Sequence, residues 1–374
     1  MVAPKRQILV LMDPQYGFCR EIVRGIRAFA DAHGGWSLRW GNPHVAVLRA
    51  MKPDECAGLI CFFGSEDTDR VAAREFPVPT VNCSARQARS LLPRVLVDNA
   101  AAGRRAAEHL LERGFTNFAF HGIGGHFYSE ERGRGFSDAV REAGCTCAVP
   151  PAGHLRELAA WLSGLERPVG ILAADDRRAQ RIIEACLDLG LGVPEEAAVV
   201  GVDDDEFLCE SAAVPLSSVD TRGWRVGQRA AELLADLVAG KPRPADPILV
   251  PPGDVMTRRS TDTVAVDDPD LIVAVKFIRD HACERMRVED IIENLRISRR
   301  TLEKRFKAAL GRTLHEEIRR AQLDRARHLL TQTRLDIAEV ADRAGFCDRK
   351  AFHKVFAEAM GMPPGVYRDR YSCS

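Results

Sequence analysis

Two stretches near the C-terminal end of the chain carry polar and basic residues at spacings that suit binding to a polyanion. In each stretch two apolar residues lie four positions apart, Leu302 with Phe306 and Phe352 with Phe356, which places each pair on one face of a helix. Arginine can bind O6 and N7 of guanine with two hydrogen bonds, whereas lysine more often neutralises phosphate. Simple solvation explains one such face equally well, but two matched faces favour double-stranded DNA as the partner. The residues predicted to contact DNA are Ser298, Arg299, Arg300, Lys304 and Lys307 in the first stretch, and Arg349, Lys350, His353 and Lys354 in the second.

Each basic face belongs to a predicted pair of helices joined by a tight turn. The second helix of each pair opens on a residue of N-cap type, Ser298 or Asp348. A basic helix held by a short partner helix is the geometry that enters a major groove of DNA. The pairs are predicted at Val288–Leu295 with Ser298–Leu310, and at Ile337–Ala344 with Asp348–Met360.

One longer helix is predicted between these two pairs, at Leu314–Leu330. At 1.5 Å per residue it spans roughly 25 Å. That length suits two recognition helices in successive major grooves, which lie about 34 Å apart.

The run DIAEVADRAGFCDRKAFHKVFAEAMGMPPGVYR at 336–368 resembles the signature of the AraC family of transcription regulators. Ala351 stands where that family commonly has an aromatic residue, and Lys350 stands where serine is frequent. The resemblance covers about 100 residues and implies a double helix-turn-helix, while the two departures leave the base contacts open. The shared skeleton falls on Ile337, Ala338, Gly345, Phe346, Phe352, Phe356, Gly361, Pro364, Tyr367 and Arg368.

Charge is divided unevenly along a chain whose formal net charge is zero. Residues 276–374 hold 22 Lys and Arg against 15 Asp and Glu, and the rest of the chain holds 31 against 38. A basic segment behind an acidic body favours a polyanionic partner for that segment alone.

The acidic body alternates short apolar runs with amphipathic segments, which is typical of parallel sheets covered by helices on both faces. Such a pattern over some 260 residues is best arranged as two α/β lobes with a cleft between them. Strands are predicted at Ile8–Met12, Leu59–Phe63, Val78–Cys83, Phe118–Ile123, Val169–Ala174 and Ala198–Asp203. Helices are predicted at Glu21–His33, Ala100–Arg113, Glu130–Ala143, Arg177–Leu189 and Trp224–Ala239. The predicted domains are a sensor at 1–263, a linker at 264–270 and a DNA-binding domain at 271–374.

Five segments of the body resemble the effector-binding domain of the LacI regulators and periplasmic sugar-binding proteins. They lie at 91–120, 169–183, 193–207, 215–234 and 248–261. In that family the strand ends that face the cleft contact the ligand. By motif position the resemblance implies Arg132, Asp175 and Asp203 as ligand-binding residues, with Asp13 near the end of the first strand as a further candidate.

These residue types suit a sugar. Carboxylates accept hydrogen bonds from vicinal hydroxyls, and an arginine donates a fork of N–H groups to sugar oxygens. The aromatic residues considered for stacking on a pyranose are Phe62, Phe63, Phe127 and Tyr128. The alternative is that Asp175 or Asp203 only caps the helix that follows, and Asp176 and Asp204 are expected to be structural.

The order of the domains indicates a more specific family. The LacI-type sensor begins at its first strand, without the family's usual headpiece, and an AraC-type unit follows it. This is the arrangement of the xylose operon regulators, and the junction at 258–307 is similar to theirs. That resemblance implies a homodimeric activator that binds an operator, responds to D-xylose or a related pentose and acts on RNA polymerase. Another sugar, a polyol or a nucleobase stays open as effector, as does a solute-binding role.

Other signals point away from membranes, metals and catalysis. Met1–Gln7 lacks a secretory signal, no run approaches the roughly 20 apolar residues of a membrane span, and eleven unpaired-looking cysteines suit a reducing cytoplasm. HGIGGHF at 121–127 lacks the third glycine and the lysine of phosphate loops, and Cys145 with Cys147 lacks a second ligand pair. No nucleophile elbow is present. We therefore expect no cofactor, no metal and no enzymatic activity. His109, His121, His126 and His154 are predicted to be ordinary polar or core residues.

Overall fold

A computed structural model of the chain describes residues 6–149, 158–265 and 268–371, apart from 285, 294, 296 and 361. The chain divides into two compact units. One comprises Met1–His109 and Asn117–Thr261, and the other Leu110–Thr116 and Asp262–Ser374. The predictions for His154, Gly361 and linker residues 266–267 lie outside the described residues. Helix α10 begins at Pro269, inside the predicted linker.

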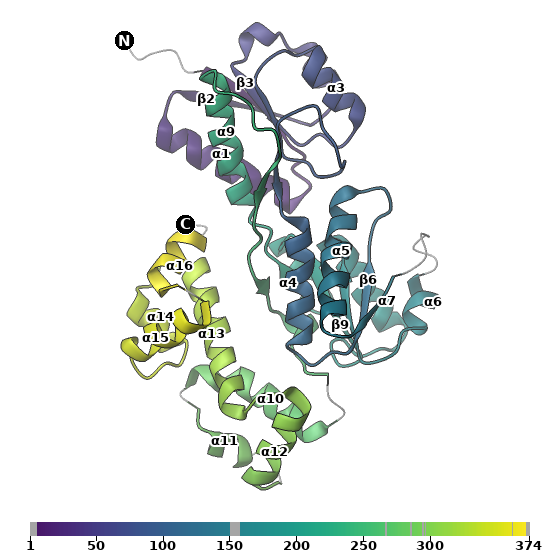
Figure 1. Cartoon of the computed structure of the whole chain (residues 1–374), viewed down its shortest axis with the longest axis vertical. Helices are drawn as coiled ribbons and strands as arrows, with labels where there is room; N and C mark the ends of the chain where they lie inside the picture. The colour runs from purple at the N-terminus through teal and green to yellow at the C-terminus, as the bar shows by residue number, and fades with distance from the viewer. Residues whose placement is uncertain are drawn as a thin grey trace. The chain divides into compact units, whose positions relative to one another are not determined.

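The first unit consists of two α/β lobes (Figure 1). In the first lobe a parallel sheet has the order β2-β1-β3-β4. Its strands are β1 (Arg6–Leu11), β2 (Trp36–Gly41), β3 (Gly58–Cys61) and β4 (Thr80–Asn82), and its helices are α1 (Gly17–His33), α2 (Val45–Ala50), α3 (Glu66–Arg74) and α9 (Gly223–Val238).

Alternate residues of β1 enter two different cores of this lobe, because side chains along a strand point to opposite faces. Ile8 and Val10 pack in one cluster with residues of α1 and α9, such as Ile22. Leu9 and Leu11 pack in the other with residues of α2 and α3. The sheet is therefore covered on both faces, as the apolar runs of the sequence predict.

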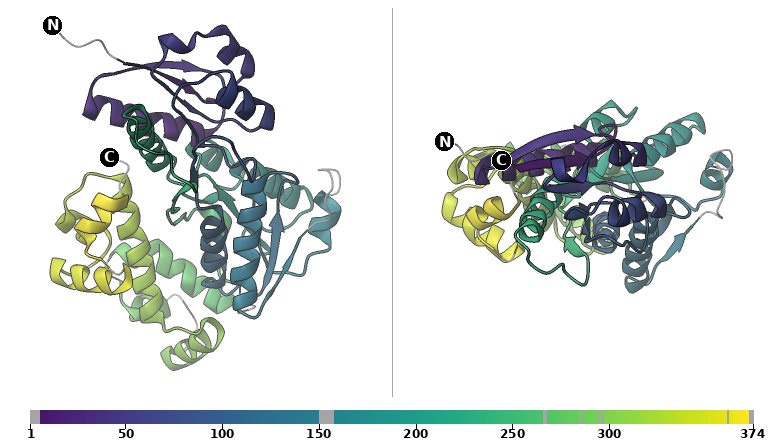
Figure 2. Two further views of the ribbon diagram at one scale, coloured as in Figure 1. Left: turned by 45° about the horizontal axis from the view of Figure 1, so that its top comes forward. Right: turned by 90° about the horizontal axis from the view of Figure 1, so that it is seen from above.

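The second lobe has a six-stranded sheet of order β12-β10-β9-β8-β6-β7, parallel except for β12. Its strands are β6 (Asn117–His121), β7 (Thr146–Ala148), β8 (Val169–Ala173), β9 (Ala197–Val202), β10 (Ser217–Val219) and β12 (Val255–Met256). Its helices are α4 (Asn99–Leu111), α5 (Phe127–Glu142), α6 (Leu158–Ser163), α7 (Asp176–Asp188) and α8 (Glu206–Ser211). The left view of Figure 2 also shows the two lobes as distinct bodies.

The chain passes between the lobes three times. A short parallel ladder of β5 (Val95–Val97) and β11 (Ile248–Val250) packs with the core of the first lobe. Helix α9 packs there too, although β10 before it and β12 after it belong to the second lobe. In proteins whose domains close around a ligand, the hinges lie in a few residues of such connecting segments.

Helices α4 and α5 pack closely, and this contact positions Arg132 on α5. A Cβ atom on Gly103 of α4 would lie 1.9 Å from the carbonyl oxygen of Arg132 on α5, and one on Gly135 would lie 1.9 Å from that of Ala100. Only glycine allows the two backbones to approach so closely.

The second unit is helical in all of its described elements. Its α-helices are α10 (Pro269–His281), α11 (Val288–Glu293), α12 (Arg299–Leu310), α13 (Leu314–Gln332), α14 (Ile337–Arg343), α15 (Arg349–Met360) and α16 (Pro364–Tyr371). Helix α13 contributes Leu314 and Ile318 to a core with α10–α12, and Ala326 and Leu330 to a core with α14–α16. The predicted fold class, a two-lobed α/β domain followed by an all-α domain with two helix-turn-helix motifs, is confirmed.

Several elements escape the sequence patterns for a physical reason. Edge strand β2 alternates half-buried and exposed residues, and β7 is three residues long, so neither forms an apolar run. Helix α5 begins at Phe127, three residues before the predicted start, and β4 is shorter than the predicted strand at Val78–Cys83. Across the described ranges, no helix combines the length and the apolar character that a membrane crossing requires.

Candidate functional site

A cleft lies between the two lobes of the sensor, at the carboxyl ends of their strands. Ligands bind at such strand ends in open α/β sheets. The first lobe contributes Tyr16, Phe18 and Phe62, and the second contributes Tyr128 together with several charged side chains. The charged lining residues are Arg86, Arg132, Asp175, Asp176, Arg177, Asp203 and Asp205.

Arg132 is the centre of the polar part of this cleft. Its side chain is only 5% exposed, and its Nε donates to Asn99 Oδ1 at 2.9 Å. One terminal nitrogen donates to the carbonyl oxygen of Ala174 at 2.6 Å, and the other to Asp203 Oδ1 at 2.9 Å. The guanidinium also lies 5.0 Å from the ring centroid of Tyr128. A buried charge needs such partners, and here they hold Arg132 in one orientation.

Asp203 reaches Arg132 from the end of β9 through an unusual backbone. Its φ is 117°, and that of the next residue, Asp204, is 49°. These left-handed values are strained for residues other than glycine, and such strain concentrates at functional sites. Burial raises the pKa of Asp203 to about 6, although Arg132 opposes the rise.

Asp175 caps the helix that follows it and also lines the cleft. It is the N-cap of α7, accepts a hydrogen bond from the backbone of Arg178 at 3.0 Å and pairs with that side chain at 2.8 Å. It also borders the cleft, near Arg132 and Asp203.

Asp13 lies in an adjoining pocket rather than in the cleft itself. That pocket is lined by His44, Ser65 and Thr68 among others, and it shares Arg86 with the cleft. Asp13 Oδ1 accepts a hydrogen bond from the backbone of Gln15 at 3.0 Å. Arg132, Asp175 and Asp203 therefore line one cleft, and Asp13 lies in the pocket beside it, which shares Tyr16, Phe62 and Arg86 with the cleft.

Two of the four aromatic residues considered for stacking on a sugar line the cleft, and two do not. Phe62 and Tyr128 line the cleft, whereas Phe63 is buried in the core of the first lobe. Phe127 is absent from the lining and donates its backbone N–H to the carbonyl oxygen of Arg86. Sequence reasoning missed Tyr16, Arg86, Asn99 and Asp205. Asn99 and Asp205 lie inside the family-like segments 91–120 and 193–207, so the resemblance could have indicated both residues.

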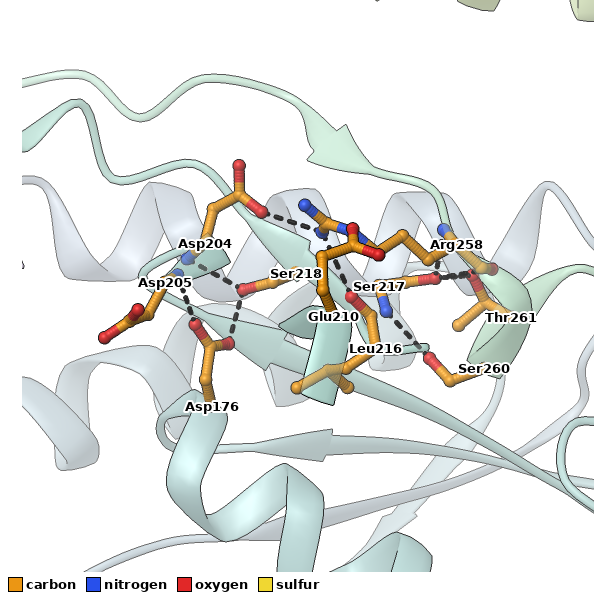
Figure 3. A network of polar contacts seen from close by, with 10 residues as sticks. All are labelled: Asp176, Asp204, Asp205, Glu210, Leu216, Ser217, Ser218, Arg258, Ser260 and Thr261. Atoms are coloured by element: carbon orange, nitrogen blue, oxygen red, sulfur yellow. Dashed lines mark hydrogen bonds and ion pairs between the residues drawn. The ribbon is translucent and has the colours of Figure 1, made fainter. Parts of the chain in front are cut away.

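A polar network supports the strained turn after β9 (Figure 3). Asp176 Oδ1 lies 2.5 Å from Ser218 Oγ, and its Oδ2 accepts the backbone N–H of Asp205 at 2.8 Å. Asp204 pairs with Arg258 at 2.8 Å. Burial raises the pKa of Asp176 well above its usual range. Asp176 and Asp204 therefore hold the turn that carries Asp203 and Asp205.

Direct contacts also join the two lobes across the cleft. Arg20 of α1 pairs with Asp205 at 3.0 Å, and the backbone N–H of Gly17 donates to the same carboxylate at 3.0 Å. Arg177 of α7 donates to the carbonyl oxygen of Gln15 at 2.8 Å. These contacts tie the start of α1 to the second lobe.

The first helix-turn-helix consists of α11 and α12. The Ser298 side chain accepts the backbone N–H of Thr301 at 3.2 Å and so caps α12. Leu302 and Phe306 are fully buried, and all four predicted basic residues of α12 are exposed. Arg299 is drawn into ion pairs with Glu289 and Glu303, so it is less free than the other three.

The second helix-turn-helix consists of α14 and α15. Phe352 and Phe356 are fully buried, and Arg349, Lys350 and Lys354 are exposed. His353 is half-buried, and its Nε2 has no hydrogen-bond partner among the described residues. Where the chain is described, no group of three His, Cys, Asp or Glu residues has the arrangement of a metal site.

Comparison with known proteins identifies both units. A model of the periplasmic binding protein-like domain matches residues 107–261, and a model of the helix-turn-helix domain matches residues 291–370. The xylose operon regulatory protein of Escherichia coli strain K12 is 33% identical over 99% of this chain and 98% of its own length. The protein of the same name from Haemophilus influenzae is 30% identical over 97% of this chain and 98% of its own. A solved structure of the xylose-binding transcription activator xylR covers all of both chains with 31% identity and a TM-score of 0.64.

Proposed function

The chain belongs to the family of xylose operon regulatory proteins and is a DNA-binding transcriptional regulator, and we propose that a sugar bound in the interlobe cleft switches it. The observation that carries the proposal is the set of Arg132, Asp203 and Asn99 at the strand ends in the cleft. A pentose such as D-xylose, the ligand implied by the relatives' names, is the first effector to test.

Each group in the cleft has a role in binding a sugar. The side chains of Asn99, Asp203 and Asp175 accept hydrogen bonds from vicinal hydroxyls, and Arg132 orients two of these acceptors while donating to a ring or hydroxyl oxygen. Tyr128 and Phe62 offer apolar faces to the C–H groups of the ring, one from each lobe.

Because its contacts come from both lobes, the ligand binds the closed arrangement better than an open one. A ligand shifts a conformational equilibrium only by its difference in affinity for the two states. Moving most of the population requires a difference of a few kcal/mol, about 5.5 for a complete reversal from 1:99 to 99:1.

Ligand binding is coupled in this proposal to two DNA-binding helices, α12 and α15. Their exposed basic residues enter successive major grooves of an operator, with arginines contacting bases and lysines contacting phosphates. We further propose a homodimer, so that paired half-sites are bound together, and activation through RNA polymerase in the cytoplasm.

The test is isothermal titration of the full-length protein against a panel of pentoses, followed by DNA shift assays with and without the ligand. We expect one pentose to bind and to change the affinity for operator DNA. If no pentose binds while a polyol or nucleobase does, the sugar assignment is wrong. If the protein shows no salt-sensitive DNA affinity, only a solute-binding role is left.

A further inference from the structure

Gln322 is a polar residue buried in the middle of the long helix α13, where it is only 6% exposed. Its amide nitrogen donates one hydrogen bond to the carbonyl oxygen of Ala282 at 3.1 Å and another to that of Gly345 at 2.9 Å. These two hydrogen bonds form the Gln322 clamp. The amide oxygen accepts from Arg319, one turn earlier on α13, at 3.4 Å. A buried amide is costly unless its donors are bonded, and both N–H groups of Gln322 are used here.

The two carbonyl groups of the clamp belong to different halves of the DNA-binding unit. Ala282 follows α10 in the short 3-10 helix η4 (Ala282–Glu284) and packs in the core that α10–α12 share with the start of α13. Gly345 lies in the turn between α14 and α15, and its neighbours Ala344 and Phe346 pack in the core of the other half. Figure 1 shows α13 running between these two groups of helices. One side chain therefore connects the two helix-turn-helix halves.

The backbones of the two halves meet directly beside the clamp. Gly345 has a φ of 80°, and a Cβ atom on it would lie 2.5 Å from the carbonyl oxygen of Ala282 and 2.8 Å from Cα of Cys283. Glycine suits both conditions because it has no Cβ and adopts a positive φ without strain. Arg319 adds a further contact, since its guanidinium lies 5.2 Å from the ring centroid of Phe346 in the same turn. The turn of the second helix-turn-helix is therefore held against the first half.

Each half carries one recognition helix on its own core. Leu302 of α12 packs in the same cluster as Ala282, and Phe352 of α15 packs in the same cluster as Phe346. At 1.5 Å per residue the 19 residues of α13 span about 28 Å, which sets the separation of the halves along the helix axis. Apolar contacts are non-directional and leave each half able to roll about that axis. The directional hydrogen bonds from Gln322 to both halves oppose such rolling.

We propose that Gln322 is a positioning residue that fixes the spacing at which α12 and α15 reach successive major grooves of DNA. This role rests on the proposed function, in which both helices contact one operator. One base pair added between the two contacted segments moves them about 3.4 Å further apart and turns one by roughly 35° about the DNA axis. A rigid pair of recognition helices cannot follow both changes, whereas a pair joined by apolar packing alone can adjust. The clamp therefore makes the protein reject operators whose two segments are one base pair too close or too far apart.

The experiment measures how DNA affinity depends on that spacing. The full-length protein selects a duplex from a random-sequence pool, and hydroxyl-radical footprinting locates the segments that it covers. Arg300→Ala in α12 and Arg349→Ala in α15 assign each segment by the protection that is lost. Shift assays then compare this parent duplex with duplexes carrying one base pair more or one fewer between the segments. For the wild-type protein we expect either change to weaken binding about tenfold or more, because one recognition helix loses its base contacts.

Substitution then assigns the spacing dependence to the amide. Gln322→Met keeps the length of the side chain but removes both donors, so the loss caused by one added or removed base pair should shrink to about threefold or less, because flexibly joined modules can still bind together. Gln322→Lys keeps N–H donors for the same carbonyl oxygens and should keep part of the dependence. Gln180→Met is the matched control, because it removes an amide in the sensor that donates to the carbonyl oxygen of Leu208 at 2.7 Å, and it should change neither affinity nor spacing dependence.

The outcomes separate this role of Gln322 from the proposed function. A wild-type protein that covers two segments but tolerates an added base pair would overturn the role and leave DNA binding standing. A residue that only stabilised the fold would lower the affinity for every duplex by the same factor, so a spacing dependence that Gln322→Met retains in full would overturn the role as well. If the wild-type protein covers one segment or binds no duplex, the role fails together with the proposed contact of both helices. Should Gln322→Met be unfolded by circular dichroism, Gln322→Lys and the wild-type spacing series decide.

Discussion

At the scale of single residues, the cleft depends on the mutual support of Arg132 and Asp203. The side chain of Arg132 is 5% exposed and that of Asp203 is 24% exposed, and each supplies the other's counter-charge at 2.9 Å. Removing one partner of such a buried pair leaves an uncompensated charge, which typically costs 3–5 kcal/mol, roughly. Asn99 accepts the Nε–H of Arg132 and the carbonyl oxygen of Ala174 accepts another N–H, so three contacts rather than one decide the orientation of the guanidinium.

The raised pKa of Asp203 predicts a pH-dependent ligand affinity. Its carboxylate is present above its folded pKa of about 6 and is lost as the pH falls below that value. Because only the carboxylate pairs with Arg132 and accepts two hydroxyl hydrogen bonds, we expect affinity to fall as the pH drops through about 6. Titration calorimetry over a pH series measures this.

Asp203→Asn is the control for that series, because Asp220 also has a pKa raised by burial to about 6. The variant should bind more weakly and should show no inflection in this range. An inflection near pH 6 that persists in Asp203→Asn would assign the effect to another group and contradict the prediction.

At the scale of elements, the contact between α4 and α5 positions Arg132. A methyl group at Gly103 would lie 1.9 Å from the Arg132 carbonyl oxygen, a distance that the rigid backbones can relieve only by moving apart. Overpacking of this kind costs about 1–3 kcal/mol. The same movement displaces Arg132 from Asn99 and Asp203.

We therefore expect Gly103→Ala to lower both the thermal stability of the sensor and its affinity for ligand. The melting temperature should fall by several degrees, since about 1 kcal/mol corresponds to about 2–4 °C in a domain of this size. The matched control is Gly124→Ala, because a Cβ atom there meets nothing within 4 Å. Equal melting temperatures and affinities for the two variants would show that the helices adjust without cost.

Recognition helices α12 and α15 lead to a prediction of their own. Lys304 and Lys354 are exposed on these helices and neither forms an ion pair with a described residue, so both can neutralise phosphate. Lys304→Ala or Lys354→Ala should weaken binding to all DNA sequences alike and reduce the slope of log affinity against log salt by about 1.

Electrophoretic shift assays over a salt series measure that slope. Lys241→Ala, which removes an exposed lysine just beyond α9 in the sensor, is the control and should leave it unchanged. A slope that stays at the wild-type value in both recognition-helix variants would place these lysines away from the DNA backbone.

At the scale of the whole molecule, the signal that we propose is closure of the two lobes of the sensor. Arg20, Gly17 and Arg177 connect the lobes directly. The Arg20 side chain is 43% exposed, so its ion pair with Asp205 contributes modestly, about 0.2–1 kcal/mol. Such a contact adjusts the balance between open and closed states without deciding it.

Arg20→Met should therefore weaken ligand affinity by about two- to fivefold, because fewer molecules are closed before binding. Titration calorimetry gives the affinity, and small-angle scattering shows whether the ligand-free protein becomes more expanded. Arg27→Met removes an ion pair within α1 that does not cross the cleft, and it should change neither measurement. If the two variants behave alike, the contact between the lobes does not influence closure.

Features that depend on local interactions can be predicted from the amino-acid sequence alone. The helix-turn-helix motifs follow from N-cap residues and from apolar pairs four positions apart, so Ser298 caps α12 and Phe352 and Phe356 are buried, as predicted. The parallel sheets follow from fully apolar strands such as β8. The family resemblance added Arg132, Asp175 and Asp203, which the fold does bring to one cleft.

The pairing of charges in the cleft follows from the fold and not from any pattern in the sequence. Arg20 lies 185 positions from Asp205, and Arg132 lies 71 from Asp203, so no periodicity can relate them. The side chain of Arg86 lies across the space that Gly64, from another segment, leaves open. These contacts join segments that are far apart in the sequence, and local sequence patterns do not predict long-range packing.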